Sequence, residues 1–119
     1  MSFAPGVDVG TLKWLTTFVS VLNVNPADTN WHELALAVYL PIGAKAVFVR
    51  ESMTSSAAGD EVYLSWDSSQ VDLDCRCQVA TVYNDAAGVV RLTSSRSIWY
   101  KASSANVSAH LVQLCGYFQ

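Results

Sequence analysis

Charged residues are scarce in this sequence. Of its 119 residues, 14% are Asp, Glu, Lys or Arg and 51% are hydrophobic, whereas an average soluble domain has roughly 25% charged residues. A chain with so little charge cannot give its whole surface a polar cover, so we expect another subunit to cover some apolar surface. The net charge of −3 argues against a nucleic-acid partner bound through a broad basic surface.

Long apolar runs and cysteines are also few. No run reaches the roughly 18–20 apolar residues of a membrane span, so no membrane partner is expected. No Lys or Arg precedes Lys13, so the N-terminus resembles neither a secretory signal nor a transit peptide, and we expect the protein to mature in a reducing cytosol. The cysteines Cys75, Cys77 and Cys115 are too few for a disulfide scaffold, and we predict free thiols that pack as small apolar side chains.

Alternation of apolar and polar residues with a period of two is the dominant pattern, and it predicts half-buried strands. In the clearest segment, residues 71–83, one face begins with Val71 and Leu73 and the other with Asp72 and Asp74. Turn-rich patches of Gly, Asn, Asp and Ser separate such segments. The predicted strands cover residues 14–24, 31–39, 44–53, 60–66, 71–83, 88–93, 97–102 and 107–118. About eight short strands predict an all-β fold, an antiparallel two-sheet sandwich that is jelly-roll-like.

The N-terminal region divides into an arm and the first strand. Residues 11–22 also fit one face of a helix, but the β-branched residues among them favour a strand. Residues 1–13 are predicted to form an extended N-terminal arm, and residues 14–119 the sandwich domain. Apolar residues in the arm predict that it docks on a neighbouring protein, and simple terminal disorder is the alternative. These docking residues are Phe3, Val7, Val9 and Leu12.

Two segments, residues 44–53 and 107–118, carry apolar residues on both faces. An antiparallel sandwich strand normally leaves one face to water, so a second layer must cover the outside. We predict that this layer is a neighbouring subunit of a homotrimer, and a loop of the same chain is the alternative. The predicted interface residues are Val47, Val49, Val112, Leu114 and Phe118.

Motifs that would indicate catalysis are missing. The sequence has no G-x-S-x-G elbow, no phosphate-binding loop and no H-E-x-x-H metal helix. The two histidines, His32 and His110, are far apart in sequence, so only a dispersed Ser-His-Asp set stays open. Cys75 and Cys77 are too few for a zinc site, and the acidic group around Asp67 is interpreted as a solvated loop rather than a calcium site. We therefore expect no enzyme activity, no cofactor and no metal.

The four tryptophans allow an alternative function, which is the binding of sugars. Trp14, Trp31, Trp66 and Trp99 are expected to pack in the core or at a subunit interface. Aromatic side chains that are exposed together at loop ends would instead stack on sugars. Sugar binding is therefore kept as an alternative.

Two stretches resemble a known group of domains. These stretches are Trp-His-Glu-Leu-Ala-Leu at residues 31–36 and Leu-Pro-Ile-Gly-Ala-Lys-Ala-Val at residues 40–47. They are similar to an aromatic-led strand and a following P-x-G-A-K-A-V pattern in small β-sandwich domains of tailed-phage virion proteins. The ending Leu-Cys-Gly-Tyr-Phe at residues 114–118 looks like the last strand of such domains. The resemblance covers roughly residues 31–118 and implies a jelly-roll-like sandwich, a homotrimer and a place on the particle surface. These motifs contain no catalytic residue.

Such domains occur as head decoration (cement) proteins and as tail-fibre tips. The short chain has no shaft repeat or heptad, which favours a decoration protein that binds the major capsid protein on the capsid surface after assembly in the host cytoplasm. A partner that binds only the assembled shell stabilises it. The alternative is a tail-fibre or receptor-binding module, and a glycan partner is considered only under that alternative.

Overall fold

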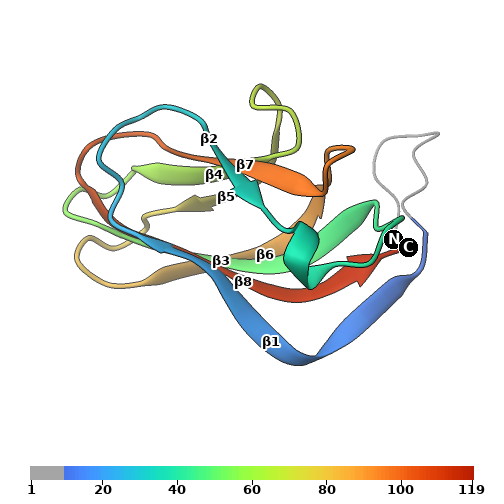
Figure 1. The fold of residues 1–119 in the computed structure, drawn as a ribbon. Helices are drawn as coiled ribbons and strands as arrows, with labels where there is room; N and C mark the ends of the chain where they lie inside the picture. Colours follow the sequence, from blue (N-terminus) through green and yellow to red (C-terminus); the bar gives the residue numbers. More distant parts are fainter. Residues whose placement is uncertain (1–9) are drawn as a thin grey trace.

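The computed structural model describes residues 10–119, which form two packed antiparallel sheets of four strands each (Figure 1). The strands are β1 (Leu12–Val24), β2 (His32–Ala35), β3 (Ala46–Ser55), β4 (Glu61–Ser65), β5 (Val71–Arg76), β6 (Asn84–Arg91), β7 (Ser97–Ala102) and β8 (Val107–Phe118), with a short 3-10 helix η1 (Ala37–Tyr39) after β2. The described residues contain no helix long and apolar enough to cross a membrane. The predicted two-sheet sandwich is confirmed.

The strand order is that of a jelly roll. One sheet has the order β1-β8-β3-β6 and the other β2-β7-β4-β5. The pairs β1·β8, β2·β7, β3·β6 and β4·β5 are all antiparallel neighbours. The chain is therefore one long hairpin that is rolled so that successive pairs alternate between the sheets.

The sandwich has two distinct ends. At the terminal end, Thr11 and Gln119 exchange two backbone hydrogen bonds, and the loop over residues 36–45 lies beside them. At the opposite, open end lie the loops over residues 25–31, 56–60, 77–83 and 103–106. Backbone bonds join several of these loops, for example from Ser56 N–H to the Asn106 carbonyl. The direction of the two strands that flank a loop determines the end of the sandwich at which the loop lies (Figure 1).

The core fills the space between the sheets. Its main cluster contains Val47, Val49, Leu64, Ile98 and Leu114, all of which are fully buried. A second cluster around Met53 and the cysteines continues it toward the open end. Full burial of a Val, Leu or Ile side chain contributes about 1.5–3 kcal/mol, so these positions dominate the stability of the domain.

All eight predicted strands are present, but β2 and β5 are much shorter than predicted and β4 is slightly shorter. β2 ends at Ala35, two residues before η1 begins at Ala37, and β5 ends at Arg76. Residues 77–83 form a loop because Asn84 replaces the strand hydrogen bonds there. Its side chain accepts a bond from the Gln78 N–H and donates to the Val82 carbonyl. The predicted turn after residue 83 is therefore wrong, because Asn84 begins β6.

β1 is a strand, as the β-branched residues predicted, but it is strongly bulged. Trp14 pairs with Gly116 and Val19 with Leu114, so β1 contains three more residues than β8 between these two pairs. The extra residues swing outward, which forms the bend in β1 at the lower edge of Figure 1. Bulges of this kind redirect side chains at sheet edges, and β1 is an edge strand.

Gly116 makes the close approach of β1 to β8 possible. A Cβ at this position would lie 2.8 Å from the Lys13 carbonyl oxygen and 3.4 Å from the Trp14 Cα. Since both are backbone atoms, Gly116→Ala is expected to destabilise the fold by about 1–3 kcal/mol, measured by urea unfolding. Gly88→Ala is the matched control, because its Cβ would meet only the end of the Leu73 side chain. An equal loss in both variants would contradict this role of Gly116.

Candidate functional site

Four of the five predicted interface side chains are buried inside the protein itself. Val47, Val49, Val112 and Leu114 belong to the main core and are at most 1% exposed. They face the second sheet, so they have no surface left to offer a neighbouring subunit. The structure therefore corrects the prediction and assigns these side chains to the protein's own core.

The fifth side chain, Phe118, lies on the outer face of its sheet. Phe48 pairs with Gly116 and Val49 with Leu114, so Cys115 is an extra residue in β8. The extra residue reverses the alternation, and Phe118 joins an outer cluster with Ala46 and Val89. The protein's own Leu12 and Phe48 pack against this cluster, so Phe118 is only 2% exposed. The outer cover here comes from strand residues of the same sheet, and not from a loop folded over it, which is the alternative interpretation of the two-sided strands.

Aromatic side chains next to this cluster remain in contact with solvent. The Trp14 ring lies 5.3 Å from the Phe48 ring and 6.2 Å from the Phe18 ring, centroid to centroid. Trp14 is 59% exposed and Phe18 47% exposed. Trp14 and Phe18 form an exposed aromatic patch on the bend of β1, with the half-buried Phe48 of β3 beside Trp14, and partly exposed aromatics of this kind are frequent anchors of protein interfaces.

The loop over residues 36–45, the terminal loop, is held in place and presents apolar side chains outward. The Arg96 guanidinium donates to the carbonyls of Leu40, at 2.7 Å, and Ala37, at 3.3 Å. The Gln119 side chain donates to the Ile42 carbonyl at 3.2 Å. On this fixed backbone, Val38 and Ile42 are each 86% exposed. The loop is a preformed apolar surface beside the point where residue 10 enters the sandwich.

Only part of the predicted N-terminal arm lies within the described structure. Phe3, Val7 and Val9 lie outside the described residues. Leu12 begins β1, pairs with Phe118 and packs on the outer cluster. The structure therefore corrects the arm boundary, because the chain from Leu12 onward belongs to the sandwich.

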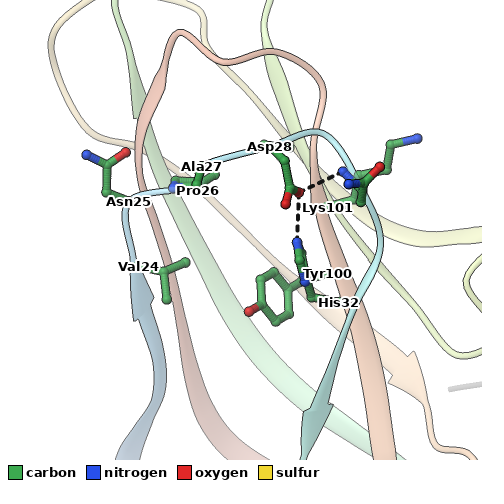
Figure 2. Close-up of a pocket in the computed structure, with 10 residues that line it drawn as sticks. Val24, Asn25, Pro26, Ala27, Asp28, His32, Tyr100 and Lys101 are labelled. Carbon is green, nitrogen blue, oxygen red and sulfur yellow. Dashed lines mark hydrogen bonds and ion pairs between the residues drawn. The ribbon is translucent and has the colours of Figure 1, made fainter.

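A pocket opens at the open end, between the end of β1, the start of β2 and the end of β7 (Figure 2). Its volume is about 200 Å³. It is lined by Val24, Asn25, Pro26, Ala27, Asp28, Asn30, His32, Tyr100, Lys101 and Ala102. One part of this lining is apolar and the other carries hydrogen-bonding groups.

Asp28 is the fixed polar group of the pocket. Its Oδ1 accepts bonds from the Asn30 N–H, at 2.9 Å, and from His32 Nε2, at 2.7 Å (Figure 2). The bond from the Asn30 backbone, followed by that from His32, lowers the pKa of Asp28, so the carboxylate is ionised at neutral pH. The Asn30 side chain also bonds to this carboxylate and lowers its pKa further, and the Asp28 side chain is 41% exposed, so the carboxylate can still accept a bond from a ligand.

Tyr100 connects this pocket with a buried polar pair. Its ring lies 5.5 Å from the His32 ring and 5.8 Å from the His110 ring. Behind it, His110 Nε2 lies 2.6 Å from Glu51 Oε2, and both side chains are fully buried. Within residues 10–119, Glu51 Oε1 and His110 Nδ1 have no hydrogen-bond partner.

The Glu51–His110 pair is uncharged in the folded protein at neutral pH. Burial raises the pKa of Glu51 well above its usual value, and burial lowers the pKa of His110 to about 4. The carboxyl group therefore holds the one proton that the pair shares, and the imidazole stays neutral. This arrangement avoids the large cost of two buried charges.

Neither histidine pairs with a nucleophile. Among the described residues, the only side-chain hydrogen-bond partners of His32 and His110 are the carboxylates of Asp28 and Glu51. Cys75, Cys77 and Cys115 are buried free thiols, as predicted, and burial raises the pKa of Cys75 to about 12. Such a thiol stays protonated and is a poor nucleophile.

The acidic residues near β5 serve the fold. The backbone N–H groups of Gln70 and Ser69 bind Asp67 and lower its pKa to about 2. Asp72 forms a two-oxygen ion pair with Arg91. Residues 10–119 contain no group of three or more His, Cys, Asp or Glu side chains that could hold a metal ion.

The sequence analysis missed the pocket and the buried pair. Glu51 occupies an inward position in phase with Val47 and Val49, and His110 in phase with Val112 and Leu114. A polar residue in phase with a core face is the pattern that would have revealed the pair. The pocket had no such pattern, because the loop over residues 25–31 and β7 are far apart in sequence.

No protein-family model matches the chain, and no curated protein matches it. The function is therefore argued from the geometry of the described residues.

The buried pair predicts a specific dependence of stability on pH. In the unfolded chain the two groups titrate near their ordinary values of 4.5 for Glu51 and 6.5 for His110. Between these values the folded and unfolded pairs each hold one proton, so the pair does not make the free energy of unfolding depend on pH. Above pH 6.5 only the folded pair keeps its proton, and stability falls by up to about 1.4 kcal/mol per pH unit. Below pH 4.5 the unfolded pair takes up a second proton first, so stability also falls.

Glu51→Gln tests this, because the amide can still bond to His110 but carries no titrating proton. Urea unfolding between pH 4 and 9 should show the loss above pH 6.5 disappear and a loss below pH 6.5 appear, the latter from His110 alone. Asp85→Asn is the control, because hydrogen bonds from Ser52 and Arg50 lower the pKa of this surface carboxyl below the range measured. If Glu51→Gln keeps the wild-type slope above pH 6.5, the neutral pair is refuted.

Proposed function

We propose that the protein is a non-enzymatic structural protein of a tailed-phage particle, a decoration (cement) protein that binds the major capsid protein and stabilises the head as a homotrimer. The observation that carries the proposal is the apolar terminal end. Val38 and Ile42 are exposed there on a fixed loop, beside Gly10, where the N-terminal segment enters the sandwich. The jelly-roll fold and the motifs of residues 31–47 and 114–118 support it.

The terminal loop suits docking because its backbone is already held. Arg96 and Gln119 fix the carbonyls on both sides of the loop, so little conformational freedom is lost on binding. Two apolar side chains at 86% exposure then bury nearly their full surface against a partner. Phe3, Val7 and Val9 are further apolar residues in the sequence that precedes Gly10.

Stabilisation of the head follows from binding linkage. A protein that binds the assembled shell but not its free subunits shifts the equilibrium toward the shell, by about 2.7 kcal/mol per site at a concentration 100 times the dissociation constant. No catalytic group is needed for this effect. It requires a surface that bridges neighbouring capsid subunits, and a trimer provides three copies of the terminal end.

The exposed aromatic patch supports self-association. Trp14 and Phe18 lie on an edge strand, outside the core, and Phe48 lies beneath them. A stable interface buries roughly 800 Å² per partner and usually centres on aromatic anchors. The trimer contact is therefore proposed at this patch rather than at the buried residues Val47, Val49, Val112 and Leu114.

Attachment to the head can be measured with purified heads that lack the protein. The double variant Val38→Ser with Ile42→Ser should bind at least about tenfold more weakly, because two apolar side chains no longer leave water. Deletion of residues 1–9 should also weaken binding but leave a folded sandwich, since the pairing of β1 with β8 begins at Leu12.

The matched control is Val79→Ser with Val82→Ser. These valines are also exposed, at 59% and 48%, but they lie at the open end. Wild-type occupancy of heads by the terminal-loop variant would exclude the proposed attachment. Recovery of the protein with separated tails, and none with heads, would favour the second candidate, a receptor-binding module of a tail.

The trimer contact is tested by Trp14→Ser with Phe18→Ser. The wild-type mass in solution or on the particle should correspond to three chains, and the variant should be monomeric because the aromatic anchors are gone. Tyr83→Ser is the control, since this aromatic side chain is equally exposed, at 63%, at the open end. A wild-type protein that is monomeric in both settings would refute the trimer.

A further inference from the structure

We infer that the pocket at the open end is a binding site for a single neutral pyranose residue of a glycan. The pocket lies at the opposite end of the sandwich from the terminal loop (Figures 1 and 2). A domain held by its terminal end would therefore present this pocket outward. The inference goes beyond the attachment proposed above and does not depend on it, because it rests on the pocket alone.

The size of the pocket suits one sugar ring. Pockets for drug-sized ligands have volumes of roughly 300–1,000 Å³. The volume here is about 200 Å³, which is too small for such a ligand. A single six-membered sugar ring with its hydroxyl groups has a volume of the right order. The remainder of a glycan chain can extend from the open mouth of the pocket.

The chemistry of the lining matches the two faces of a pyranose. Val24, Pro26 and the Tyr100 ring supply apolar surface for the C–H face of the sugar. The ionised Asp28 carboxylate, whose side chain is 41% exposed, is an acceptor for sugar hydroxyls, and such charge-assisted bonds are stronger than neutral ones. The Tyr100 hydroxyl, which Figure 2 shows directed away from His32, has no hydrogen-bond partner within residues 10–119 and can donate or accept.

The charge of the lining selects against anions. The Asp28 carboxylate repels a phosphate or carboxylate ligand. Lys101 does not neutralise it, because its ammonium group lies over the Trp31 ring, 5.5 Å from the centroid. The ligand class is therefore a neutral hexose or N-acetylhexosamine rather than a sialic or uronic acid.

The binding groups are already in position. The Asn30 N–H and His32 hold Asp28, and the rings of His32 and His110 contact Tyr100 from two sides. Such a site loses little freedom when a ligand binds, which allows a small ligand to bind measurably. For a ligand of this size the dissociation constant is expected to be on the order of 1 mM.

The test is an NMR titration of the full-length protein with four probes: the methyl glycosides of glucose, galactose, mannose and N-acetylglucosamine. At least one should shift the amide signals of residues 24–32 and 100–102 in a saturable manner. Tyr100→Phe, which removes only the hydroxyl, and Asp28→Asn should each weaken that binding by about tenfold or more. The methyl glycoside of glucuronic acid should bind more weakly than its neutral counterpart.

Two control variants make the same Tyr-to-Phe and Asp-to-Asn substitutions at positions outside the pocket. Tyr83→Phe lies at the same end and Asp85→Asn on β6, and both should bind like the wild type. Thermal unfolding of each variant shows whether weak binding reflects loss of the fold, and Tyr100→Phe keeps the ring that packs on His110. Saturable shifts from none of the four neutral probes, tighter binding of the glucuronide, or unchanged binding by Tyr100→Phe and Asp28→Asn would each overturn the inference.

Discussion

The pairing of β8 with both β1 and β3 is the constraint on which the rest of the structure depends. β8 is the second strand of its sheet and carries neighbours on both sides. Gly116 lets β1 approach, and the extra residue Cys115 reverses the alternation so that Phe118 faces outward while Tyr117 packs on the core. The bend of β1, the outer apolar cluster and the exposed aromatic patch all follow from this local register.

The fold was accessible from sequence because its dominant pattern is local. Alternation of period two, interrupted by turn residues, is a property of consecutive residues, and it located all eight strands. The free thiols followed in the same way, from the small number of cysteines. The errors arose where a few residues interrupt the local pattern: Cys115 in β8, the three extra residues of β1, and Asn84, whose side chain holds the loop over residues 77–83 between β5 and β6.

Functional features were harder to predict because they depend on contacts between distant segments. Val47 and Val49 were correctly recognised as apolar, but the sequence alone could not assign their face to the protein's own core or to a partner. The pocket joins Asp28 with Tyr100, which are separated by most of the chain. By contrast, Glu51 and His110 each stand in phase with core residues, so their burial could have been predicted, although their mutual contact could not.

The direction of the strands has a mechanical consequence. The strands run along the long dimension of the sandwich, which measures 39 × 30 × 22 Å, with residue 10 at one end and the pocket at the other (Figure 1). Ladder hydrogen bonds lie across the strands. A force that pulls the pocket loop over residues 25–31 away from an anchor at residue 10 therefore acts along the covalent backbone of β1, which joins the two points directly, and does not pull the ladder hydrogen bonds apart one by one. A force applied between residue 10 and Gln119, which lie side by side, would instead peel β1 from β8 one bond at a time. The domain is accordingly built to resist tension along its own axis.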